Sequence, residues 1–199
     1  MPGAQIIVLS EHVDYWDHDG WRDPNSSAQV TERQTAYEQV LGLDTPYTPQ
    51  IIVDGAVEAR LDQLQKVSQT LRQEIGVPKV PVHILSLTVD PANASLLRAH
   101  IEVDADSQGR HADIYDAVAL NRVESQVKSG ENGGKHLVHV AVVQGMSKIG
   151  KLEKGNKFEK EIAIKLKPGT DPKNARLVVF VQQPGPGKVL GTAMQTVAN

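Results

Sequence analysis

Cysteine is missing from all 199 residues of this sequence. The chain therefore has no disulfide, no thiolate metal ligand and no cysteine nucleophile. Thiol–disulfide exchange begins with attack by a thiolate, so the chain as it stands cannot carry out that reaction. The absence assigns no compartment, because a cysteine-free chain is compatible with either redox environment.

Long apolar runs and a charge of one dominant sign are missing as well. No stretch approaches the ~18 apolar residues of a membrane-spanning helix, and the N-terminus lacks the basic and apolar parts of a signal peptide. The 21 Lys and Arg residues nearly balance the 24 Asp and Glu residues, for a net charge of −3. We therefore expect no membrane span, no nucleic-acid partner and, taking the chain literally, a cytoplasmic location.

Aromatic residues make up only 4% of the chain, yet both tryptophans and three of the four tyrosines lie within residues 11–55. Trp16 and Trp21 belong to a polar loop at residues 11–26 that is rich in turn-forming acids. Such side chains either line a ligand cleft or pin a loop onto its domain, and pinning is the commoner role.

The first 75 residues are expected to combine strands and helices. Residues 4–10 form a continuous apolar run rich in β-branched side chains, which is typical of a strand buried on both faces of an α/β sheet. Ser26 or Ser27 is the predicted N-cap of a helix that Gly42 ends. Periodicity and turn residues then predict a strand at 51–53, an Asp54–Gly55 turn, a returning strand at 57–59 and a helix at 61–75.

From Val80 onward the apolar pattern changes from a helical period to a period of two. Short strands separated by Gly, Pro, Asn and Asp turns indicate an antiparallel β-sandwich of the immunoglobulin-like kind. We place a domain boundary at 76–79, which gives domains at 1–77 and 78–199. The predicted strands are 80–89, 95–104, 113–123, 136–146, 157–166, 176–183 and 188–196.

Several short motifs carry a resemblance to a known family. They include His12 to Asp17, Gly20 to Pro24, Thr31 to Gln34, Tyr47 to Gln50 and Val53 to Gly55, followed by Gly130 to Asn132, Leu177 to Val181 and Val189 to Gly191. In order and spacing they resemble a family of secreted bacterial proteins of unknown function, with a thioredoxin-like domain followed by a β-sandwich.

That resemblance implies more chain than is present. Family members begin with a strand and a helix that carries Cys-x-x-Cys, after an export signal, whereas Met1–Gly3 looks like the loop into the second strand. The chain therefore looks N-terminally truncated, with an incomplete thioredoxin-like domain. Because strands pair at ~4.8 Å, losing a central one would leave a gap of ~10 Å between two unpaired edges. Such edges invite pairing with another protein or with a second copy of the chain.

The resemblance also supplies candidate binding residues. Tyr47-Thr48-Pro49-Gln50 looks like the cis-proline loop that presents backbone groups to an extended peptide; the alternative is that Pro49 merely opens an edge strand. The candidate peptide- or cleft-binding residues are Tyr47, Thr48, Pro49, His12, Asp14, Trp16 and Trp21.

No metal, cofactor or catalytic site is expected. Imidazole and carboxylate groups can ligate metals, but the loop lacks the bidentate Glu of a calcium loop, since residue 28 is Ala. His136 and His139 fall on opposite faces of a predicted strand, which disfavours a shared chelate. Arg33 is expected to pair with a loop acid. The loop residues considered as ligands are His12, Asp14, Asp17, His18, Asp19 and Asp23.

Two functions from different classes follow. The first is a non-catalytic binding or interaction module, which we favour for this chain. The alternative is a fragment of a secreted thiol–disulfide oxidoreductase whose dithiol lies upstream of Met1. An intact family member would be periplasmic or secreted.

Overall fold

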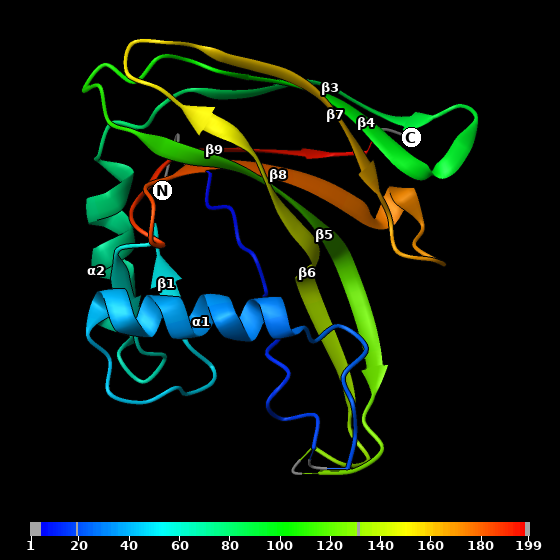
Figure 1. Cartoon of the computed structure of the whole chain (residues 1–199). Helices are drawn as coiled ribbons and strands as arrows, with labels where there is room; N and C mark the ends of the chain where they lie inside the picture. Colours follow the sequence, from blue (N-terminus) through cyan, green and yellow to red (C-terminus); the bar gives the residue numbers. More distant parts are fainter. Residues whose placement is uncertain (1–4, 19, 131, 198–199) are drawn as a thin grey trace.

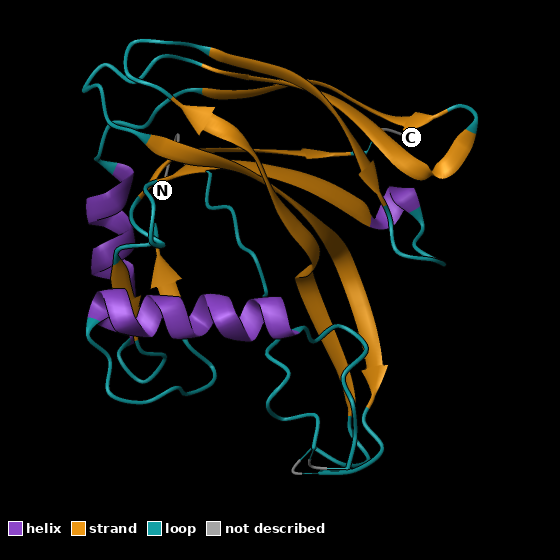
Figure 2. Cartoon of the chain, viewed as in Figure 1, coloured by secondary structure: helices purple, strands orange, loops and turns teal. Residues whose placement is uncertain are grey.

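The computed structural model describes residues 5–18, 20–130 and 132–197. Two antiparallel sheets face each other, and two helices lie at one end (Figures 1 and 2). The three-stranded sheet has the order β3-β4-β7 and the four-stranded sheet β6-β5-β8-β9. Their bounds are β3 Val82–Asp90, β4 Asn93–Val103, β5 Ala112–Gln126, β6 His136–Leu152, β7 Phe158–Lys165, β8 Ala175–Gln182 and β9 Val189–Thr196, with a 3-10 turn at Pro172–Asn174.

The antiparallel sandwich expected from the period-two pattern is confirmed. Each of the seven predicted strands is present within a few residues of its expected bounds, except that β6 continues to Leu152. Alternate side chains from both sheets form the main core. Burying each of them stabilises the fold by about 1.5–3 kcal/mol. The largest are Leu97, Ile101, Ile114, Leu152, Leu177 and Leu190, all under 2% exposed.

Asp116 interrupts this core. It lies between Ile114 and Val118 at strand spacing and is 5% exposed, and its Oδ1 atom is buried without a hydrogen-bond partner. Burial raises the pKa of Asp116 above its ordinary value of 3.8. A carboxyl with a raised folded-state pKa favours the fold below its unfolded pKa, and this contribution is lost as pH rises through the folded value.

Asp116→Asn is therefore expected to raise the free energy of unfolding at pH 7, because it removes a buried, under-bonded charge. The gain should shrink as pH falls toward 3.8, the ordinary pKa of this carboxyl. Urea unfolding at both pH values measures it. Asp113→Asn is the control: this carboxylate pairs with Lys148 at 2.6 Å and should not stabilise the protein when neutralised. A variant no more stable than the parent at pH 7 would contradict the prediction.

The N-terminal third contains the predicted helices and hairpin. Helix α1 is Ala28–Leu41, with Ser27 accepting a hydrogen bond from the Val30 N–H and Gly42 in the left-handed conformation at the C-cap. Strands β1 (Ile51–Val53) and β2 (Val57–Ala59) pair across a turn in which Asp54 and Gly55 have φ of 48° and 66°. Helix α2 is Leu64–Ile75, so the prediction of a start at residue 61 is wrong by three residues.

The prediction of a buried strand at 4–10 is wrong for the described residues 5–10, and Ala4 lies outside them. The segment makes a single parallel bridge, from Ser10 to Val142 of β6. Ile6 and Val8 are 51% and 54% exposed. A strand needs a neighbouring strand along its whole length, but β6 pairs with this segment only at Ser10.

Helix α2 also exposes part of its predicted apolar face. Leu64 and Ile75 are 68% and 39% exposed, whereas Thr70 is buried. Residues 76–79 then lead into β3, and the division into domains at this point remains a prediction. In the part of the chain that the structure describes, neither helix is long and apolar enough to cross a membrane.

Candidate functional site

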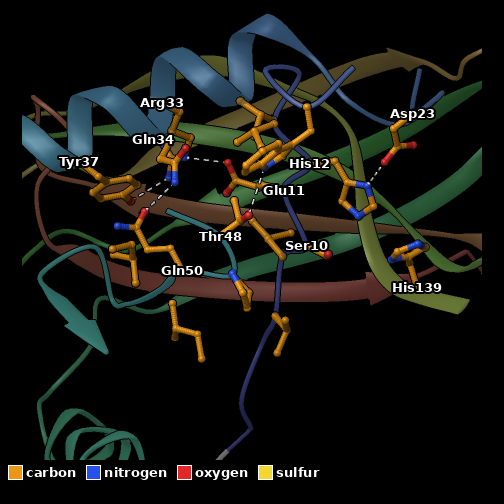
Figure 3. A pocket seen from close by; sticks show the side chains of 18 of the residues that line it. Ser10, Glu11, His12, Asp23, Arg33, Gln34, Tyr37, Thr48, Gln50 and His139 are labelled. Carbon is orange, nitrogen blue, oxygen red and sulfur yellow. Dashed lines mark hydrogen bonds and ion pairs between the residues drawn. The ribbon is translucent and has the colours of Figure 1, made fainter. Parts of the chain in front are cut away.

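A cleft of about 990 Å³ separates the N-terminal third from the four-stranded sheet. Its walls come from residues 7–13, from α1, from the loop before β1 and from strands of the sandwich (Figure 3). Apolar and polar side chains both line the cleft, as in many ligand sites. Apolar lining residues include Ile7, Leu9, Val30, Ile51, Ile52, Val178 and Phe180.

The loop before β1 forms one rim of the cleft. The Thr48–Pro49 bond is cis, as predicted, and the Trp16 Nε1–H donates to Thr48 Oγ1 at 3.2 Å. Tyr47 points to Glu58 instead and does not line the cleft. Burial and the adjacent Glu58 carboxylate raise the pKa of Tyr47 to about 12, so its hydroxyl stays protonated as a donor.

Gln34 of α1 holds this rim in place. Its Nε2 donates to the Tyr47 carbonyl at 3.1 Å and to Gln50 Oε1 at 3.2 Å, while its Oε1 accepts from the Tyr15 hydroxyl at 3.1 Å. One buried amide therefore connects the loop at residues 11–26, the cis-proline loop and the helix. The Nε2 atom of Gln50 is buried beside the cleft without a partner in the described structure.

Arg33 joins α1 to the sandwich. Both of its terminal nitrogens donate to Gln182 Oε1 at 3.2 Å, and one also donates to the Tyr37 hydroxyl at 3.0 Å. Its guanidinium stacks over the rings of Tyr37 and Phe180 at 5.0 and 5.5 Å. Arg33 Nε lies 3.3 Å from Glu11 Oε2, so the predicted pairing with a loop acid is confirmed. The contact is an ion pair, because the N–H of Nε is not directed at the carboxylate oxygen closely enough for a hydrogen bond.

His12 and His139 lie at the other end of the cleft. His12 Nδ1 is 2.6 Å from Asp23 Oδ2, and its ring meets that of His139 edge to face at 4.8 Å (Figure 3). Burial raises the pKa of Asp23, but hydrogen bonds from His12 and Asn25 outweigh it, so that pKa is lowered overall. Burial, followed by the nearby His12 charge, lowers the pKa of His139. The pair therefore favours a neutral His139 near pH 7.

The predicted binding residues divide into two groups. His12, Trp16, Trp21, Thr48 and Pro49 line the cleft, whereas Tyr47 and Asp14 do not. The Asp14 carboxylate accepts from Thr31 Oγ1 at 2.6 Å, which attaches the loop to α1. Whether the lining residues bind a ligand remains a prediction.

No group of three metal-ligating side chains gathers within residues 5–18, 20–130 and 132–197. Two of the residues named earlier, Asp19 and Glu131, lie outside the described part. His136 and His139 do not share a site: His136 pairs with Glu124 at 3.0 Å, while His139 faces the cleft.

Sequence reasoning missed Gln182, which is 1% exposed and bonds to Arg33, Tyr37 and the Gly187 carbonyl. A signal was present, since Gln182 and Gln183 end an apolar strand run at 177–181. Glu11 and Gln50 were also missed as cleft residues. Gln50 belongs to the cis-proline motif, whereas Glu11 has no sequence context that separates it from other surface polar residues.

The fold resembles that of an Agrobacterium tumefaciens protein solved by structural genomics, with a TM-score of 0.69, 23% identity, and coverage of 96% of this chain and 80% of that one. A sporulation control protein of Bacillus subtilis is less similar, with a TM-score of 0.41, 11% identity, and coverage of 62% of this chain and 49% of that one. A domain of an outer membrane lipoprotein from Porphyromonas gingivalis has a TM-score of 0.35, 13% identity, and coverage of 61% of this chain and 89% of that one. A search of curated proteins gave no match.

A family model described as a protein of unknown function, DUF1223, matches residues 2–182. The match spans both the cleft-forming N-terminal third and most of the sandwich. The chain therefore belongs to the DUF1223 family.

Proposed function

We propose that the chain is a non-catalytic binding module that holds an extended polypeptide segment of another protein in the cleft. The observation that carries this proposal is the pair of open backbone edges on the cleft walls. Within the described structure, residues 6–9 make no backbone hydrogen bond, and β1 pairs with β2 alone. Ile7 to Leu9 and Ile51 to Ile52 line the same cleft.

Open edges recognise an extended chain through its main-chain N–H and C=O groups, while pockets select alternate side chains. The apolar lining residues of the cleft favour β-branched or aromatic residues on the face of the ligand that enters the cleft. The expected thioredoxin-like ancestry fits this proposal, because it would place a strand between the same two edges. The cis-proline loop at the rim adds backbone groups beside them.

A peptide titration tests the proposal. An acetylated, amidated heptapeptide of alternating valine and threonine should change the emission of Trp16 and Trp21, which both line the cleft and are the only tryptophans. The same peptide with N-methylated central amides cannot pair and should not bind. Equal responses to both peptides, or none to either, would refute the proposal. Multi-angle scattering separately identifies a second copy of the chain as donor, by a doubled mass.

The resemblance of Tyr47-Thr48-Pro49-Gln50 to the peptide-presenting loop of thioredoxin-like proteins favours a second proposal, that the chain is part of a secreted thiol–disulfide oxidoreductase with its dithiol upstream of Met1. In that case the exchange reaction would belong to the longer protein, and this chain would supply the peptide-binding rim. Genomic sequence upstream of Met1 tests it. An in-frame extension that encodes a strand, Cys-x-x-Cys and a signal peptide would support it, and an in-frame stop codon would end it.

A further inference from the structure

Among the residues that the structure describes, four carboxylates line the cleft, and three of them are already hydrogen-bonded. Asp17 accepts from Ser26, Asp23 accepts from His12, and Asp54 accepts from Lys79. Glu11 is different: the one partner of its carboxylate in the described structure is Arg33, whose Nε lies 3.3 Å from Oε2 and out of line. An ionised carboxylate offers about four acceptor positions, so Glu11 has unused acceptor capacity in the cleft.

Arg33 compensates the Glu11 carboxylate only in part. Its terminal N–H groups are directed to Gln182 and Tyr37, and only Nε approaches the carboxylate, at 3.3 Å and out of line. Both side chains are mostly buried, with exposed fractions of 16% for Arg33 and 24% for Glu11. Burial raises the pKa of Glu11, and the positive charge of Arg33 offsets only part of this effect. An under-bonded buried carboxylate is costly, so a ligand donor placed there gains more than it would in water.

We infer that the segment held in the cleft carries a lysine or arginine side chain whose charged end donates to Glu11. This inference rests on the proposed function and names the chemistry that the same cleft selects. The described lining of the cleft holds four carboxylates against one guanidinium, which favours a basic over an acidic ligand side chain. Three of the four terminal N–H groups of Arg33 already donate to Gln182 and Tyr37, which leaves little of the guanidinium for a ligand carboxylate.

The inference is tested with the valine–threonine heptapeptide, in which one lysine replaces each position in turn and acetyl-lysine provides the uncharged match. At one position, or at positions on one face of the peptide, the lysine peptide should bind about tenfold more tightly than the acetyl-lysine peptide. Glu11→Gln should abolish that difference while it retains the affinity of the neutral peptide. Asp17→Asn, which alters an already bonded cleft carboxylate, should leave the difference in place.

The outcomes separate the two proposals. Binding of all peptides without a preference for lysine at any position overturns the basic-ligand inference and leaves the binding module intact. Loss of every peptide, neutral ones included, refutes both. The comparison of lysine with acetyl-lysine on the unmodified protein decides the inference even if Glu11→Gln fails to fold.

Discussion

Gln182→Ala is expected to lower the free energy of unfolding by about 3–5 kcal/mol, the cost of breaking one partner of a buried charged network. Gln182 is 1% exposed, and its single side chain serves Arg33, Tyr37 and the Gly187 carbonyl. Its removal leaves two guanidinium N–H groups without their acceptor on the apolar side of α1. For a protein of this length the melting temperature should fall by roughly 10 °C.

Chemical denaturation of the purified variant measures the loss. Gln39→Ala is the matched control, because Gln39 lies on the exposed side of the same helix α1. It should change stability by less than about 0.5 kcal/mol. A double-mutant cycle with Tyr37→Phe adds a stricter test. The two residues share a 2.8 Å hydrogen bond, so their effects should be non-additive by about 0.5–3 kcal/mol. Additive effects, or a Gln182 variant as stable as the parent, would mean that the network does not hold α1 to the sheet.

This network also shows where sequence reasoning stops. The strands from Val80 onward were predictable, because their alternation is local and each turn is marked by Gly, Pro, Asn or Asp. The cap at Ser27 and the turn at Asp54–Gly55 were predictable for the same reason. Gln182 and Arg33 are 149 residues apart, and no local pattern reports that they meet.

The buried strand predicted at 4–10 failed for a related reason. A continuous β-branched run indicates the strand state, but a strand also requires a neighbour to bond with, and that neighbour is a long-range property. The same failure creates the candidate site. The segment keeps apolar side chains and unpaired backbone groups. These face a cleft, where the predicted buried strand would have had a neighbouring strand. The cis bond at Pro49 could be predicted only from the family resemblance, since proline alone is compatible with either isomer.

Of the two single variants Ile7→Pro and Val8→Pro, only one is expected to lose affinity for the peptide. In an extended segment successive N–H groups point to opposite edges, so only one of Ile7→Pro and Val8→Pro removes a donor from the edge that faces an inserted strand. That variant should lose about 2 kcal/mol of binding free energy, or roughly thirtyfold in affinity, through the lost hydrogen bond and the ring's contact with the ligand. The other variant is its control, since it carries the same substitution one residue away.

Val8→Pro should keep the melting temperature of the parent, whereas Ile7→Pro should lower it slightly, because Ile7 packs against the buried cluster of Ala117, Val178 and Phe180. Among the described residues, neither backbone group forms a hydrogen bond, and Val8 is 54% exposed. Tryptophan emission during titration with the valine–threonine peptide measures affinity, and thermal unfolding measures stability. Equal affinities in the two variants and the parent would show that residues 6–9 do not pair with the ligand, and the open-edge mechanism would fail. Ile7 packs against this buried cluster, whereas Val8 is 54% exposed. A loss of affinity confined to Val8→Pro therefore reports the missing N–H, and a loss confined to Ile7→Pro also includes lost apolar contact.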